Sequence, residues 1–340
     1  MVETVSRQTL VKQERDLWSL GVLPMLAVGS VAGWLGVYWD IAWHIDKGRD
    51  SFFSPPHNFI YAFMLIVLTM SLYGLLRDGR DTPFHLNVGR FNLHPGLLIV
   101  AVGAMLVLFF APADELWHRV FGPDATLWGP MHLIGLLGFT MATFGGLLSC
   151  WLERSLGTNK NRQRLFNVSA FYFAILLLGW TMLYLAEFEY GIQFFPMFWY
   201  SLLLTGLPTF TLVLIAKLDP FPWATTLTSF FFSVLRLLLS GFLMTTAYFD
   251  LAGDNRPHIP LLLFTGLAAD ILVRRKVPLW LTGLLLGVIT FYSNYYQHQL
   301  NWYTNSILIG LPLGLVLSVT LSYLASAVAA SLPRLKKVKA

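Results

Sequence analysis

One arrangement of carboxylate and imidazole residues occurs twice in the first half of the chain. Both copies follow the pattern Asp-x2-Trp-His-x5-Asp-x4/5-Pro-x-His, the first over residues 40–57 and the second over residues 114–132. Imidazole nitrogens and carboxylate oxygens are common ligands of transition metals, so the repeat is typical of a metal site. The candidate ligands are Asp40, His44 and His57 in the first copy and Asp114, His118 and His132 in the second.

The spacing gives both copies the same geometry. Residues four apart on a helix are neighbours with Cβ atoms about 6 Å apart, so the Asp and the first His of each copy can point at one atom. A short connection then returns the chain and supplies the second His. Two imidazoles and one carboxylate leave coordination positions open, and they permit Cu(II), Zn(II) or Fe(II). Neighbours expected to orient these ligands are Arg49, Asp50 and Asp124.

Two other interpretations of the repeat are a hydrogen-bonded network that joins helix ends and a proton path. The bare Asp-x3-His spacing is a weak signal, since it also occurs at 81–85 and 254–258. In both of those segments an internal proline argues against a helical turn. The whole template occurring twice is the stronger signal, and polar groups in or near lipid tend to be functional because they are costly. We therefore favour metal sites.

The composition requires a membrane to position these residues. The 340 residues are 56% hydrophobic and 12% charged, against about 25% charged in soluble domains, which excludes a soluble fold, a disordered chain and a coiled coil. The single cysteine, Cys150, excludes an internal disulfide. A membrane-crossing helix needs about 20 apolar residues, so we predict an all-α polytopic transmembrane helical bundle. Its ten expected spans, of which the eighth and ninth are short, are 18–45, 56–76, 96–120, 128–152, 167–186, 197–216, 223–247, 259–273, 278–295 and 306–331.

The basic residues predict the orientation of the chain. Of the 23 Lys and Arg residues, 18 lie on the side that holds both termini and four on the other side, which places both termini in the cytoplasm. The metal ligands then lie at the extracytoplasmic face of the cell (inner) membrane. The first apolar run is too long for a cleaved signal peptide. Basic residues 334–339 are expected to contact anionic lipid and no nucleic acid, because no aromatic residues interleave with them.

The repeat also divides the chain into two regions. Residues 18–76 and 96–152 form two helical hairpins built alike. We therefore interpret residues 1–152 as a duplicated two-hairpin metal-binding membrane region. Residues 153–340 add further transmembrane helices and the basic cytoplasmic tail.

Polar residues outside the repeat are expected to have structural roles. Arg236 and Asp270 lie at similar depth in the seventh and eighth expected spans. We predict an ion pair between them, because an unpaired charge at that depth is costly. Glu187 and Glu189 are interpreted as solvated loop charges, and His94 as an ordinary loop residue on the opposite side of the membrane.

The first copy of the template resembles a copper-binding membrane subunit of the particulate methane and ammonia monooxygenases, the copper membrane monooxygenase family. In that family an Asp, His, His copper site has ligand gaps of three and twelve residues, and a nearby Asn, His, His site has gaps of three and thirteen. Both triads here match those gaps, although Asp114 replaces the Asn, and the match covers about residues 36–135 of a longer chain. The residues that carry it are Trp43-His44, Arg49-Asp50-Ser-Phe-Phe-Ser-Pro-Pro-His57, Phe59 and Tyr61.

The resemblance implies copper as the cofactor, although the residues alone also permit iron or zinc. It implies an oxidoreductase, a monooxygenase or a subunit of one, that activates oxygen to oxidise a small apolar substrate. Other membrane monooxygenase subunits or a homo-oligomer are the implied partners, and a quinol is the implied reductant. The alternative is a non-catalytic copper-binding or copper-transfer membrane protein. No further acidic or His residues continue the sites through the first four spans, which argues against transport.

Overall fold

The structure is a computed structural model of the 340-residue chain. It describes residues 16–48, 51–78, 85–89, 91–122, 126–156, 160–190, 197–218, 221–245, 258–295 and 304–334. Three residues that we expected beside the triads lie outside these ranges, namely Arg49, Asp50 and Asp124.

The described residues fold almost entirely into helices, which confirms the predicted all-α bundle. Eight helices are long and apolar enough to cross a membrane, and a helix satisfies its own backbone where lipid offers no hydrogen-bond partner. The strands β1 (Leu86–Val88) and β2 (Phe91–Leu93) form a small antiparallel hairpin. The helices are α1 (Val22–Lys47), α2 (Pro55–Asp78), α3 (Pro95–Phe121), α4 (Pro130–Leu156), α5 (Lys160–Leu183), α6 (Ala186–Glu189), α7 (Met197–Leu218), α8 (Ala224–Thr245), α9 (Leu263–Arg274), α10 (Leu279–Tyr295) and α11 (Thr304–Arg334).

The eighth and ninth expected spans correspond to α9 and α10. These helices have 12 and 17 residues, fewer than the roughly 20 that span a bilayer without tilt or thinning. They pack against each other and against the longer α7, and α10 also packs against α11. The chain is therefore a multi-pass membrane protein with eight long candidate spans, and a lipid bilayer is its environment.

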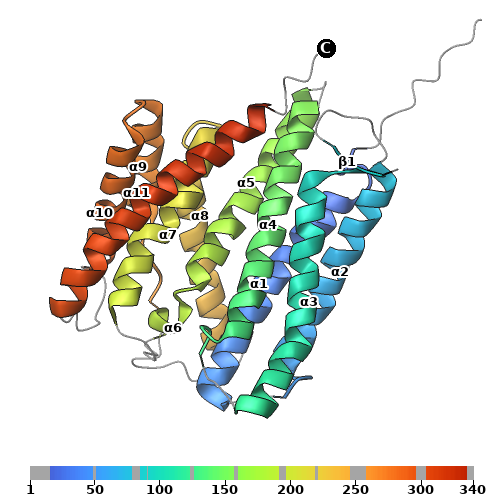
Figure 1. Ribbon diagram of the computed structural model, residues 1–340, viewed down its shortest axis with the longest axis horizontal. Coiled ribbons are helices and arrows are strands. Elements are labelled where there is room, and N and C mark those ends of the chain that lie inside the picture. Colours follow the sequence, from blue (N-terminus) through green and yellow to red (C-terminus); the bar gives the residue numbers. More distant parts are fainter. Residues whose placement is uncertain are drawn as a thin grey trace, which may run out of the picture.

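The two hairpins that contain the repeat lie side by side at one end of the molecule (Figure 1). α1 packs on α2, α3 packs on α4, and contacts of α2 with α3 and of α1 with α4 join the hairpins. A Cβ atom added to Gly103 would lie 2.5 Å from the carbonyl oxygen of Gly138, and one added to Gly145 would lie 2.6 Å from that of Gly96. Small residues permit such close backbone approach between membrane helices. These glycines therefore let α3 and α4 pack backbone against backbone.

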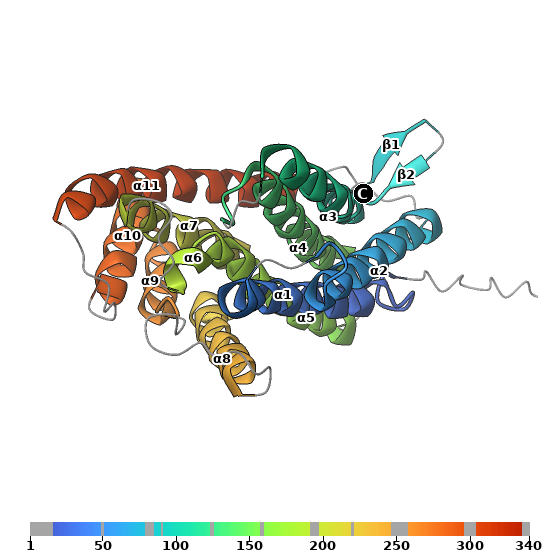
Figure 2. The same cartoon turned by 90° about the horizontal axis from the view of Figure 1, so that it is seen from below.

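Helix α5 connects the hairpins to the remaining helices. It packs against α1 and α4 on one side and against α7 and α8 on the other. In Figure 2, α9 and α10 lie at one side of the molecule, and α2 and the β1–β2 hairpin lie at the opposite side. The buried apolar core continues through both groups of helices, so each group contributes to one packed bundle.

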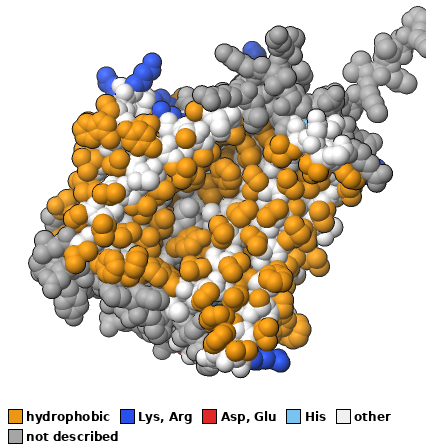
Figure 3. Space-filling model, viewed as in Figure 1, with side chains coloured by type: hydrophobic (Ala, Val, Ile, Leu, Met, Phe, Trp, Pro, Cys, Tyr) orange, Lys and Arg blue, Asp and Glu red, His pale blue; other side chains and the backbone are white. Residues whose placement is uncertain are grey.

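The surface is apolar over most of its height. Hydrophobic side chains cover most of the face in Figure 3, and the Lys and Arg side chains visible there gather near its upper and lower edges. Large apolar side chains such as Phe109 and Leu116 of α3 are 72% and 61% exposed. Such a surface is expected where helices face lipid and basic residues mark the polar boundaries.

The predicted ion pair between Arg236 and Asp270 is wrong. Arg236 is fully buried and pairs with Glu189, with 2.5 Å between Nη2 and Oε2, and its guanidinium lies 3.9 Å from the ring centroid of Tyr38. Asp270 instead accepts the backbone N–H of Thr226 at 2.9 Å. Thr226 precedes Arg236 by about 15 Å along α8. A carboxylate is favoured at the first turn of a helix, where backbone N–H groups lack partners.

Glu187 and Glu189 are buried, so their interpretation as solvated loop charges is also wrong. They lie on α6, and their exposed fractions are 5% and 0%. Burial raises the pKa of the Glu189 carboxyl above its usual value, while the charge of Arg236 acts in the opposite direction. The short α6 therefore brings two carboxylates into the protein interior.

His94 is buried as well, contrary to its interpretation as an ordinary loop residue. Its Nδ1 accepts the backbone N–H of Leu97 at 3.3 Å, and its Nε2 lies 3.8 Å from Oε1 of the buried Glu153. The side chain thus caps the first turn of α3, where helix N–H groups have no partner within the helix. This cap lies at the opposite end of α3 from Asp114 and His118.

Candidate metal centre

The first triad joins the end of α1 to the start of α2. Asp40 and His44 lie one turn apart in the last turns of α1, and His57 lies in the first turn of α2. Oδ1 of Asp40 is 3.2 Å from Nε2 of His57 and 3.7 Å from Nε2 of His44. One ligand atom from each residue lies within 4.8 Å of the others. The three predicted residues therefore converge on one point.

The second triad repeats this arrangement at the end of α3 and the start of α4. Oδ2 of Asp114 is 3.3 Å from Nε2 of His118, and its Oδ1 is 3.6 Å from Nε2 of His132. The three ligand atoms again lie within 4.8 Å of one another. The two imidazole rings are 6.0 Å apart here and 6.4 Å apart in the first triad. The two triads therefore have nearly the same dimensions.

Glycine and proline residues set the return of the chain in both hairpins. α1 is followed by Gly48 with φ 79°, and α3 by Gly122 with φ 88°. These are left-handed values that glycine adopts without strain. α2 and α4 begin at Pro55 and Pro130, because the fixed φ of proline suits the first helical position. Each short connection therefore ends with a helix whose first turn presents the third ligand.

Backbone carbonyl groups orient three of the imidazoles. In each case Nδ1 lies within hydrogen-bond distance of a carbonyl oxygen: His57 and Ser51 at 3.1 Å, His118 and Gly122 at 3.2 Å, and His132 and Thr126 at 2.7 Å. A carbonyl oxygen only accepts, so in these contacts Nδ1 carries the hydrogen and donates it. In the neutral imidazole, Nε2 then presents its lone pair to the carboxylate and to any ion between them.

The carboxylate oxygens provide a test of whether a metal fits. Oδ1 of Asp40 and Oδ1 of Asp114 are buried and accept no hydrogen bond within the described part of the chain. Each faces imidazole Nε2 atoms that also present lone pairs, and buried acceptors without a donor are costly. A divalent ion between them satisfies both kinds of atom, and nitrogen with oxygen ligands suits Cu(II), Zn(II) and Fe(II) alike. The residues present therefore fit a metal ion in each triad.

Both triads line a single cavity of about 100 Å³ between the hairpins. Its remaining lining is largely apolar and aromatic, with Val107 and Phe110 from α3, Ile60 from α2 and Phe139 from α4 among its members. A few polar groups in an otherwise apolar concavity are typical of a small-molecule site. The two triads thus open onto the same apolar space.

Two aromatic side chains beside the imidazoles had no assigned role in the sequence-based prediction. The ring of Tyr61 stacks on His57 with centroids 5.9 Å apart, and Phe110 meets His132 edge-on at 5.7 Å. Tyr61 follows His57 by one helical turn, so helical spacing alone could have placed it there. Phe110 lies on the neighbouring helix, and no local signal indicates its contact with His132.

A further contact connects the second triad to residues after α5. Oε1 of Glu187 accepts the hydroxyl of Thr126 at 2.6 Å and also the backbone N–H of Leu127. Nε1 of Trp128 donates to the carbonyl oxygen of Tyr184 at 3.0 Å. The loop that contains the Thr126 carbonyl is therefore fastened to the segment that includes α6. The repeat gives no indication of this contact, because Glu187 lies outside it.

Comparisons with models of known families, with curated proteins and with solved structures found no match to this chain. The six predicted ligands nevertheless form two separate triads, as their spacing predicted. The expectation of a relation to the monooxygenases therefore depends on the template itself.

Proposed function

We propose that this chain is a copper-binding integral membrane protein related to a membrane subunit of the particulate methane and ammonia monooxygenases. In this proposal it activates oxygen to oxidise a small apolar substrate. The observation that carries the proposal is the pair of Asp-His-His triads on one apolar cavity, in a bundle of membrane-length helices. A network that only joined helix ends would pair its acceptors with donors, whereas Asp40 and Asp114 each keep a buried oxygen without one in the described part of the chain.

Copper is the metal that we propose for both triads. Imidazole nitrogens and a carboxylate oxygen suit Cu(II), and three protein ligands leave coordination positions open. When bound there, copper supplies the redox chemistry that activates dioxygen. The Asp114 carboxylate makes the second triad more anionic than an Asn, His, His set, which favours the more highly charged oxidation state of the ion.

The protein's own residues would hold the substrate and exclude water. The apolar side chains of Val107, Phe110 and Phe139 offer no hydrogen bonds, and about 100 Å³ equals only about three water volumes. The cavity therefore suits a molecule of a few heavy atoms. Hydroxylation of one C–H bond consumes one dioxygen, two electrons and two protons, and it yields one alcohol and one water. We propose a quinol as the source of the electrons and protons.

The same proposal includes a location and partners. We place the triads at the extracytoplasmic face of the cell (inner) membrane with both termini in the cytoplasm, because 18 of 23 basic residues lie on the side of the termini. Both triads lie at the ends where α1 and α3 finish, which is consistent with one common face. An apolar substrate would arrive through lipid. Other monooxygenase subunits, or further copies of this chain, would complete the assembly.

Elemental analysis of the detergent-purified protein tests the metal assignment. We expect two copper ions per chain, one in His44→Ala, one in His118→Ala and none in the double variant. His85→Ala is the matched control and should retain both ions, because His85 lies outside the triads. Full copper content in both single variants would show that the triads do not bind it. Two iron or zinc ions in place of copper would show that the metal is wrong.

Oxygen uptake then distinguishes an enzyme from a copper carrier. The copper-loaded protein should consume oxygen when given a quinol and a small alkane, and it should form alcohol in proportion. His44→Ala and His118→Ala test which triad this activity needs. Protein that holds two copper ions, consumes no oxygen with any reductant and releases copper to a soluble acceptor would contradict catalysis and support copper transfer.

A further inference from the structure

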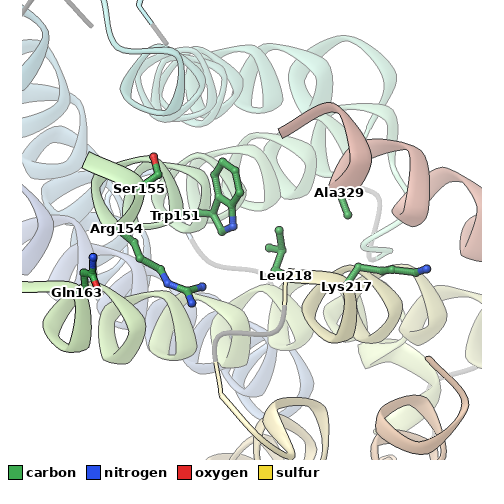
Figure 4. A pocket seen from close by; sticks show the side chains of 7 residues that line it. All are labelled: Trp151, Arg154, Ser155, Gln163, Lys217, Leu218 and Ala329. Atoms are coloured by element: carbon green, nitrogen blue, oxygen red, sulfur yellow. The ribbon is translucent and has the colours of Figure 1, made fainter. Parts of the chain in front are cut away.

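A second cavity lies at the opposite end of the bundle from the triads. Its volume is about 420 Å³. α4 and α5 form one side with Trp151, Arg154 and Gln163, and α7 forms the other with Lys217 and Leu218 (Figure 4). The cavity thus lies at the seam where the helices of the hairpin half meet those of the second half. We refer to it as the seam cavity.

Two cations give the seam cavity a positive character. Arg154 lies in the last turn of α4 and Lys217 in the last turn of α7. Within the described part of the chain neither side chain forms an ion pair with a carboxylate. In Figure 4 the guanidinium of Arg154 extends toward α5 and the side of α7 that bears Leu218. An anion is the ligand that two such cations attract.

The depth of the seam cavity corresponds to lipid headgroups. Two candidate membrane spans end at Ser155 and Leu218, and the next begins at Lys160. These positions mark the boundary between the apolar interior and the polar surface of a bilayer. Trp151 lies at the same level, where the amphipathic indole ring is favoured. Phosphate groups of lipids lie at this boundary.

A narrow apolar slot continues from the seam cavity into the bundle. It shares Trp151, Arg154 and Leu218 with the seam cavity, and further lining residues are Leu147, Ala170, Ala174 and Ile215. A free phosphate ion would make no use of this slot. An amphiphile could place its anionic group at the cations and its hydrocarbon chain along the slot, because burial of apolar area from water is favourable.

We propose that the seam cavity binds the phosphate headgroup of an anionic membrane phospholipid, with an acyl chain along the slot between α4, α5 and α7. Such a lipid would contact both halves of the bundle at once. The inference is independent of the metal, since the cavity contains none of the six triad residues.

Native mass spectrometry of the full chain in detergent tests this proposal. The protein is titrated separately with phosphatidylglycerol, phosphatidylcholine and inorganic phosphate, and the bound molecules are counted. One phosphatidylglycerol should remain bound to the unaltered protein. Arg154→Gln and Lys217→Gln should each weaken it about fivefold, and the double variant about 25-fold. Lys160→Gln is the matched control: it removes an exposed charge at the same end but outside the cavity and should change nothing.

Three results would overturn the proposal. Equal retention of phosphatidylglycerol by the double variant would show that the lipid binds elsewhere. Equal affinity for phosphatidylcholine would show that the cations do not select an anionic headgroup. Displacement of the lipid by an equal concentration of inorganic phosphate would identify a site for small anions instead. Arg154→Lys keeps the charge, so it should retain most of the affinity and thereby separate charge from packing.

Discussion

The two hairpins present the same triad in different surroundings. The His44 side chain of the first triad is 41% exposed, whereas its counterpart His118 in the second is 8% exposed. The carboxylates that they face, Asp40 and Asp114, are equally shielded at 18%. The two triads therefore differ in access to the first imidazole and not in burial of the shared carboxylate.

The loops that orient the third ligand are also held differently. In the first hairpin the contacts are local: the backbone N–H of Ser54 donates to the Ser51 carbonyl at 2.9 Å, and Asn58 donates to the Phe53 carbonyl at 2.8 Å. In the second, Glu187 binds the loop from 61 residues away at Thr126. Duplication explains the shared ligands, but the second loop has an added connection to the rest of the chain.

This difference gives the second half of the chain a part in the metal site. Residues 153–340 contain no copy of the template, yet α6 fastens the loop whose carbonyl orients His132. Partners that fix the orientation of a ligand typically alter metal affinity by about 10–100-fold. We therefore expect the second triad to respond to changes in α6 and the first triad to be indifferent to them.

Removing a carboxylate should have the largest effect. Asp40→Ala and Asp114→Ala each delete the ligand that faces both imidazoles, so copper affinity at that triad should fall by more than the roughly 100-fold that loss of an orienting partner can cost. The other triad should keep its ion. Copper content per chain and the Cu(II) electron paramagnetic resonance spectrum of each variant measure this. Loss of both ions from either variant would show that the triads are not independent and would invalidate the comparison.

The ligands could be predicted from sequence because their geometry is local. A spacing of four on a helix fixes Asp40 beside His44, and a glycine followed by a proline returns the chain within a few residues to His57. The length and apolar character of the spans similarly indicate helices before any packing is known. Local geometry repeated twice thus predicts both triads and the bundle that contains them.

Contacts between distant segments could not be predicted in this way. Depth along a span paired Arg236 with Asp270, but depth does not specify which neighbouring helix a side chain faces. Its partner Glu189 lies on a helix of four residues, which is too short to show a periodic apolar face. Glu187 lies on the same short helix, so its contact with the loop before α4 was equally hidden.

A smaller effect, confined to the second triad, is expected from Glu187→Ala. The substitution removes the acceptor for Thr126 and Leu127 and frees the loop that orients His132. Copper affinity should fall about 10–100-fold at the second triad and stay unchanged at the first. Glu187→Gln keeps an acceptor oxygen and should restore most of the affinity. Copper titration followed by electron paramagnetic resonance resolves the two sites.

The neighbouring carboxylate provides the control for this prediction. Glu189→Gln weakens the buried pair with Arg236, and breaking a buried pair typically lowers the free energy of unfolding by about 3–5 kcal/mol. It leaves the contacts of Glu187 in place. If Glu189→Gln lowers copper affinity at the second triad as much as Glu187→Ala, the effect reflects general loosening of α6, and the specific role of Glu187 is disproved.

The smallest expected effect comes from the loop of the first hairpin. Asn58→Ala removes one exposed hydrogen bond to the Phe53 carbonyl, worth about 0.5–1.5 kcal/mol. Even if all of that energy reached His57, copper affinity at the first triad would fall less than about tenfold, and the second triad would be unaffected. The same titration measures it. A greater loss here than Glu187→Ala causes at the second triad would reverse the comparison, because the local loop would then be the more important support.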